Sequence, residues 1–101
     1  RMFTSVSQQA YLVFLEGRLA ERRHALRKAL RFYQEALRLA PSYNCWMAIA
    51  RVSWGLGFYK RSLSIYRRFA KQPRYNHLKA LIKRKKQELR KARAKVLRIP
   101  E

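Results

Sequence analysis

The chain has 101 residues and a formal net charge of +20, from 25 Lys and Arg against five acids, all of them Glu. This length allows one modest core and excludes a two-domain enzyme with a cleft between its domains. Apolar residues make up 49% of the chain, which excludes disorder throughout, and the single cysteine, Cys45, excludes a disulfide within the chain. The charge is unusual, because self-repulsion destabilises a compact state unless a polyanionic partner relieves it.

The N-terminal half is predicted to begin with a leader and two helices. Residues 1–9 contain Ser and Thr, one Arg and no acid, and would suit the end of an organellar transit peptide. A helix is predicted from about Gln8 to about Arg23, because Ser5 and Ser7 can cap its first amides and apolar residues then recur every three or four positions. A second helix, about Ala25 to Ala40, repeats the pattern and ends before Pro41, which has no amide hydrogen to donate.

Two further helices are predicted around a glycine turn. The segment from Tyr43 to about Trp54 is apolar on most sides, so this helix should be buried at the centre of the fold. Gly55 and Gly57 permit a sharp turn into a helix from Phe58 to about Lys71, which Pro73 closes.

The last predicted helix, Tyr75 to about Leu97, is mainly basic. Twelve Lys and Arg lie from Lys71 to Arg98, and Glu88 is the only acid among them. One apolar edge can dock on the preceding helix, and the remainder is a basic rod that ends near Pro100.

Part of the sequence repeats. Tyr33 returns as Tyr66 after 33 residues, and Pro41-x-Tyr43-Asn44 returns as Pro73-x-Tyr75-Asn76 after 32. The first copy orders its small and aromatic residues as Gly17, Ala29, Tyr33, Ala36-Leu37 and Pro41. This period and this order resemble the tetratricopeptide repeat, a helix–turn–helix unit of about 34 residues.

The resemblance implies an all-α fold, with two antiparallel helix hairpins stacked as a short solenoid and a long basic C-terminal helix. The implied organisation is a leader at 1–9, two repeats at 10–74 (about 10–43 and 44–74) and a basic capping helix at 75–101. The second copy departs from the family pattern, with Ser53 and Ser62 at positions where an aromatic residue and Ala are usual. An unrelated all-helical bundle is the alternative. Because fewer than three repeats are usually unstable alone, the last helix or a neighbour in an assembly would have to complete the fold.

The family binds peptides in a groove lined by the first helix of each pair. The resemblance places a basic and aromatic lining here, suited to an acidic or aromatic peptide, at Tyr11, Phe14, Arg18, Asn44, Met47, Arg51 and Trp54, with Arg22 beside them. Burial of Tyr11, Met47 and Trp54 as ordinary core is the alternative.

The sequence offers no catalytic constellation. No two of the five Glu are spaced for shared acid–base work, and Gly55-Leu56-Gly57 lacks the remainder of a phosphate-binding loop. One Cys and two distant His are too few for a zinc site, and Cys45 is expected to be a small buried residue. No apolar run approaches the roughly 20 residues of a membrane span. We therefore expect no enzyme activity, cofactor, metal, small-molecule substrate or transmembrane segment.

The charge then indicates the function. Thirteen basic residues fall in residues 1–70 and twelve in the rest, so several helical faces present Lys or Arg. Such side chains neutralise RNA phosphates. The sequence predicts a structural RNA-binding protein of a large ribonucleoprotein, specifically a mitochondrial ribosomal protein of the matrix that contacts rRNA and neighbouring proteins. The predicted nucleic-acid contacts are Arg22, Arg23, Arg27, Arg31, Arg61, Arg67, Arg68, Lys79, Lys83, Arg84, Lys86, Arg90, Lys91 and Arg93.

Two other functions fit the same features. One is an adaptor whose groove holds an acidic segment of another protein. The other is a peripheral protein that lies on anionic lipid through the apolar stripe and basic flanks of its last helix. Outside mitochondria, a reducing cytosolic or nuclear compartment is expected.

Overall fold

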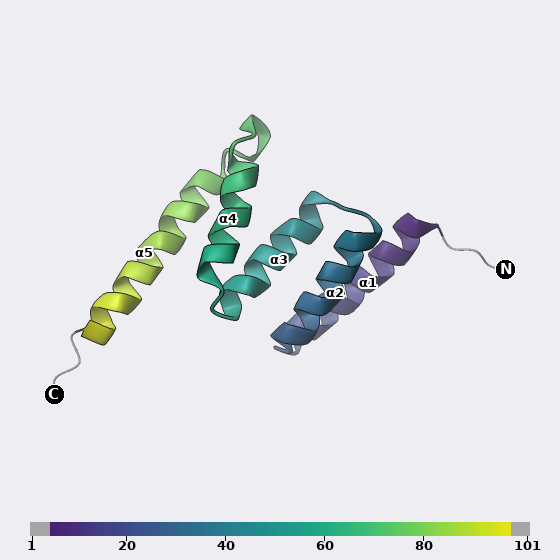
Figure 1. The fold of residues 1–101 in the computed structure, drawn as a ribbon, viewed down its shortest axis with the longest axis horizontal. Helices are drawn as coiled ribbons and strands as arrows, with labels where there is room; N and C mark the ends of the chain where they lie inside the picture. The colour runs from purple at the N-terminus through teal and green to yellow at the C-terminus, as the bar shows by residue number, and fades with distance from the viewer. Residues whose placement is uncertain (1–4, 98–101) are drawn as a thin grey trace. The chain divides into compact units, whose positions relative to one another are not determined.

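The computed structural model describes residues 5–97, and over this range the chain is all-α, as predicted (Figure 1). The first four residues of the predicted leader and the predicted end near Pro100 lie outside the described residues. The described helices are α1 Val6–Arg22, α2 Leu26–Leu39, α3 Tyr43–Gly55, α4 Tyr59–Ala70, the 3₁₀ helix η1 Pro73–Tyr75 and α5 Leu78–Leu97. The chain forms two compact units, residues 1–65 and 66–101, and the boundary falls within α4.

Helix α1 begins at Val6, slightly before its predicted start. Ser5 is the capping residue: its hydroxyl oxygen accepts a hydrogen bond from the Gln8 amide at 3.1 Å, and the Gln8 side chain accepts one from the Ser5 amide at 3.0 Å. This reciprocal pair satisfies two amides at the helix start. Ser7 lies inside the helix, so its predicted capping role is wrong.

In the first unit, α1 and α2 approach closely where Gly17 lies against Tyr33. A Cβ atom built on Gly17 would lie 2.7 Å from two carbons of the Tyr33 ring, well inside van der Waals contact. Tyr33 is fully buried, and its ring centroid lies 5.3 Å from that of Phe14. The absence of a side chain at Gly17 therefore lets the tyrosine ring fill the space between the two helices.

Helix α3 is the most deeply buried helix of this unit, as its apolar composition predicted. Six of its residues are buried: Cys45, Ala48, Ile49, Ala50, Val52 and Ser53. The burial of Cys45 is also confirmed. At the contact between α3 and α4, the fully buried Ser62 hydroxyl donates a hydrogen bond to the Ala50 carbonyl at 2.7 Å.

The α1–α2 turn and the α3–α4 turn lie along the same edge of the first unit, and the α2–α3 turn lies along the opposite edge (Figure 1). A Cβ built on Gly55, at the end of α3, would come within 2.9 Å of the Leu26 side chain at the start of α2. The α3–α4 turn passes through Gly57, whose φ of +89° is accessible mainly to glycine. This alternation of turns brings sequence-distant helix ends together.

In the second unit, the predicted start of the last helix at Tyr75 is wrong. Residues 73–75 form a 3₁₀ turn, in which the Tyr75 amide donates to the Gln72 carbonyl at 2.9 Å and the Asn76 amide donates to the Pro73 carbonyl at 3.1 Å. These short-range bonds satisfy the backbone in a tighter turn than an α-helix allows, so α5 begins only at Leu78. The buried residues Tyr66, Ala70, Leu78 and Ile82 form the apolar core of this unit.

Candidate nucleic-acid interface

One carboxylate joins the three helices α1, α2 and α3. Glu21 accepts hydrogen bonds from Arg51 Nε at 2.5 Å and from Arg51 Nη2 at 2.7 Å, and from the Tyr33 hydroxyl at 2.7 Å. Hydrogen bonding from Arg51, reinforced by Tyr33, holds the pKa of Glu21 below its ordinary value despite partial burial. Burial and the bond to Glu21 raise the pKa of Tyr33. Arg51, predicted to line a peptide groove, is therefore occupied by a structural ion pair.

The basic residues of the first unit gather at one edge. Nine of the ten Lys and Arg among residues 5–65 lie in the half of their helix next to the α1–α2 and α3–α4 turns, and only Glu16 and Glu21 accompany them. We name this edge the basic end: Arg18, Arg22, Arg23, Arg27, Lys28, Arg31, Arg51, Lys60 and Arg61. Five of the predicted nucleic-acid contacts belong to it: Arg22, Arg23, Arg27, Arg31 and Arg61, all exposed.

The opposite edge of the same unit, next to the α2–α3 turn, is electrically balanced. Within residues 5–65 its one basic residue is Arg38, which makes a bidentate ion pair with Glu35. The hydrogen bonds from Arg38 lower the pKa of Glu35, so the acid stays charged and the pair stays neutral overall. We call this edge the neutral end. The whole excess charge of the described part of this unit therefore lies at the basic end.

The second unit carries an open basic groove. It has a volume of about 550 Å³ and an apolar floor of Ala70 and Ile82, and its walls are Arg67, Lys71, Lys79 and Lys86. All four cationic side chains are exposed, and no acid lines the groove. Because like charges held close together repel, this arrangement favours an anion between them.

The groove opens onto a row of cations along α5. Lys79, Lys83, Lys86, Arg90 and Arg93 are spaced by four, three, four and three residues, which places them on one side of the helix, and all are exposed. We name this row the basic stripe. It offers one cation for each ~5 Å of the helix axis. By the same spacing, Glu88 lies on the opposite side of α5.

The other predicted contacts of this unit lie outside the groove and the stripe. Arg84 and Lys91 are exposed and share the side of α5 that carries Glu88, and Arg68 on α4 is exposed without lining the groove. The predicted contacts of α5 therefore lie on two sides of the helix. One side carries no acid, and the other also carries Glu88.

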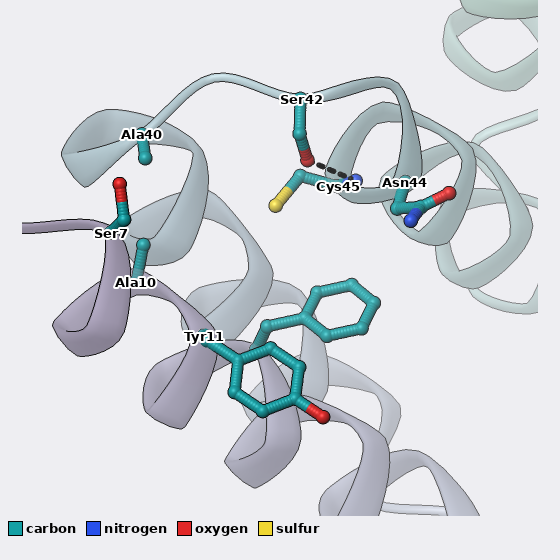
Figure 2. A pocket seen from close by; sticks show the side chains of 8 residues that line it. Ser7, Ala10, Tyr11, Ala40, Ser42, Asn44 and Cys45 are labelled. Atoms are coloured by element: carbon teal, nitrogen blue, oxygen red, sulfur yellow. Dashed lines mark hydrogen bonds between the residues drawn. The ribbon is translucent and has the colours of Figure 1, made fainter.

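The predicted peptide groove is only partly assembled. Tyr11, Phe14 and Asn44 line one small cavity of about 190 Å³ between α1 and α3, together with Ser7, Ala10, Ala40, Ser42 and Cys45 (Figure 2). There the Ser42 hydroxyl oxygen accepts a hydrogen bond from the Cys45 amide at 3.1 Å and so caps α3 (Figure 2). Arg18, Met47, Arg51 and Trp54 do not line this cavity, and no cation does.

Three features of the interface were missing from the predicted contacts. Lys71 lines the groove. In the sequence, the only sign of this was its spacing of four residues from Arg67, which places both side chains on the same face of α4. Four members of the basic end were also missing: Lys28 and Lys60, together with Arg18 and Arg51, which were predicted for the peptide groove. Phe58 and Tyr59 place two exposed aromatic rings at that same end. The partial exposure of these rings depends on how α4 packs, which local spacing does not determine.

Comparison of the chain with protein-family models, with curated proteins and with solved structures finds no match in any of the three. Among residues 5–97, no group of three or more His, Cys, Asp and Glu side chains is placed to hold a metal ion. In the same part of the chain, no helix combines the length and the apolar character needed to cross a membrane.

Proposed function

We propose that this protein is a structural RNA-binding component of a large ribonucleoprotein, with the mitochondrial ribosome as the assembly and the mitochondrial matrix as its location. The observation that carries the proposal is the continuous cationic surface of the second unit, formed by the basic groove and the basic stripe without an acid among them. Lys and Arg at regular spacing along a rigid helix match a polyanion whose phosphates are also regularly spaced.

The first unit supports the same function as a scaffold. We propose that α1–α2 and α3–α4 are two tetratricopeptide-like hairpins. The close approach of Gly17 and Tyr33 supports this, because both residues occupy positions of the family pattern. The basic end then supplies a second phosphate-binding surface, and the α1–α2–α3 ion network keeps its helices in fixed positions.

Neighbouring proteins are the proposed partners of the neutral end. Val6, Tyr11 and Leu12 are large apolar side chains that are more than half exposed near the start of α1. No cation lines the adjacent cavity, so its lining does not attract an acidic peptide electrostatically. An apolar protein surface is a better complement, and this favours assembly contacts over the adaptor function.

The membrane alternative is disfavoured by the packing of α5. Insertion into a lipid surface would use the apolar side of the helix, but Leu78 and Ile82 on that side are already buried within the second unit. The helix could offer these two side chains to lipid only by giving up the packing that they make within the unit.

The test of RNA binding uses two variants of the full chain that remove equal charge from one helix. In the first, Lys79, Lys86 and Arg90 of the basic stripe become Gln; in the second, Arg84, Lys91 and Lys95 on the other side do. Binding to single-stranded RNA is measured over a salt series by fluorescence anisotropy. The stripe variant should flatten the dependence of log K on log salt by about 2, since each lost phosphate contact removes ~0.7.

The second variant should change the slope much less, because its residues lie away from the stripe. Equal slopes in the two variants would mean that the salt dependence of binding follows the net charge of the protein and not the position of the cations. This result would contradict the proposed surface. For the assembly, the native protein is followed through a sedimentation gradient of a mitochondrial lysate. It should travel with a ribosomal subunit and leave that fraction after nuclease treatment, and its absence there would contradict the ribosomal assignment.

A further inference from the structure

The α3–α4 turn of the first unit combines exposed aromatic rings with cations. Among the described residues, the exposed large aromatic side chains are Tyr11, Phe58 and Tyr59. Phe58 and Tyr59 are each 40% exposed and are followed directly by exposed Lys60 and Arg61. Tyr11 instead lies towards the neutral end. Exposed aromatic rings and exposed cations are therefore found side by side at the basic end.

The Tyr59 ring and the backbone that carries both rings are held in place before any ligand arrives. The Tyr59 ring packs edge-on against Trp54, with the ring centroids 4.7 Å apart and an angle of 63° between the planes. The turn beneath it is fixed by hydrogen bonds from the Gly57 amide to the Trp54 carbonyl at 3.0 Å and from the Phe58 amide to the Ser53 carbonyl at 2.8 Å. A pre-ordered aromatic surface loses little conformational entropy when it binds a flat partner.

The surroundings of the rings are cationic over a wider area. The close approach of Gly55 to Leu26 brings the start of α2, with Arg27 and Lys28, to the same edge as the turn. Nine cations gather at this edge with two acids, Glu16 and Glu21, and Glu21 is already engaged by Arg51 and Tyr33. A ligand that reaches the rings therefore meets uncompensated positive charge on more than one side.

From these observations we infer that the α3–α4 turn stacks unpaired RNA bases on Phe58 and Tyr59, while Lys60, Arg61 and Arg27 hold the flanking phosphates. The inference rests on the proposed RNA-binding function and adds to it the class of RNA recognised, a single-stranded segment rather than a continuous duplex. In a duplex the base faces are stacked on each other, so an aromatic side chain reaches only bases that have left the stack.

The test compares three RNA probes of equal phosphate number: a single strand, the same strand with abasic sites in its middle, and a duplex. The wild-type protein should bind the intact single strand about 5- to 100-fold more tightly than the abasic strand, as expected for one or more stacked bases. Phe58→Ala and Tyr59→Ala should abolish most of this difference and leave duplex binding unchanged. Tyr59→Phe should preserve it, because the ring face remains.

Tyr11→Ala is the matched control, since Tyr11 is 61% exposed but lies away from the turn and from the basic end. Intact folding of each variant is checked by circular dichroism, and Phe58→Ala carries the test if Tyr59→Ala unfolds. Equal affinity of wild type and both alanine variants for the intact single strand would overturn the inference, even when RNA binding itself is strong.

Failure of RNA binding and failure of base stacking give different results. If the wild-type protein binds none of the three probes, the proposed RNA-binding function fails, and the stacking site fails with it. If the alanine variants lose affinity for an acidic aromatic peptide while binding to all RNA probes is unchanged, the turn is a protein-docking site and the inference is overturned.

Discussion

Arg51 on α3 and Glu21 on α1 are 30 residues apart in the chain, yet the Arg51 Nε and Glu21 Oε2 atoms lie 2.5 Å apart. Tyr33 on α2 donates to the same carboxylate, so one side chain links three helices of the first unit. Because the other ionic contact described in this unit, between Arg38 and Glu35, lies within one helix, the Glu21 network is its main electrostatic link between helices.

Stability should fall at acid pH through Glu21. Its pKa is lower in the folded protein than its ordinary value of 4.5, so the stabilisation is fully present above pH 4.5 and is lost as the pH falls through the lowered value. In a Glu21→Gln variant this contribution is absent. The difference in free energy of unfolding between wild type and variant should therefore shrink between about pH 6 and about pH 3, measured by urea denaturation with circular dichroism. A difference that stays constant over this range would contradict the role given to the carboxylate.

Gly17→Ala should destabilise the first unit by about 1–3 kcal/mol, as expected for overpacking of a buried site. The new Cβ would lie 2.7 Å from the Tyr33 ring, and the ring cannot move freely because its hydroxyl is bonded to Glu21. Gly55→Ala is the control, because its Cβ would meet only the mobile end of the Leu26 side chain, at 2.9 Å. Thermal and urea denaturation of both variants should show a clear loss for the first and little change for the second.

Ser53 and Ser62 are both fully buried, but their replacement by Ala should change the free energy of unfolding differently. Ser62→Ala removes the hydrogen bond to the Ala50 carbonyl and should cost about 1 kcal/mol. The Ser53 hydroxyl has no hydrogen-bond partner among the described residues, so Ser53→Ala removes an unsatisfied polar group and should leave stability unchanged or raise it by about 1 kcal/mol. Equal losses in urea denaturation would show that the hydrogen bond of Ser62 does not distinguish the two sites and would contradict the prediction.

The helices were largely predictable because apolar residues recur every three or four positions and Pro41 and Gly57 interrupt them. The start of α5 was not, since Tyr75 and Asn76 fit either a helix or a 3₁₀ turn, and the choice depends on backbone bonds around Pro73. Residue spacing alone could have separated the basic stripe from the side of α5 that carries Glu88. That spacing is a local property of one helix.

The basic end could not be derived from local spacing. Its members come from four helices, and they lie together only because alternate turns return to one edge of the unit (Figure 1). The same reason explains why the sequence places Arg51 in a peptide groove: its partner Glu21 is 30 positions away, and only the packing of α3 beside α1 reveals the ion pair. The two rings at the α3–α4 turn were missed because their exposure depends on tertiary packing.

The separation of a basic end from a neutral end gives the first unit a permanent electric dipole along its helices. In the field of a polyanion such a body experiences a torque as well as an attraction, and it turns its positive pole forward before contact. If the protein binds RNA as proposed, the first unit meets the phosphates with its α1–α2 and α3–α4 turns forward. In that orientation the apolar side chains near the start of α1 face away from the RNA, where the proposed protein partners would reach them.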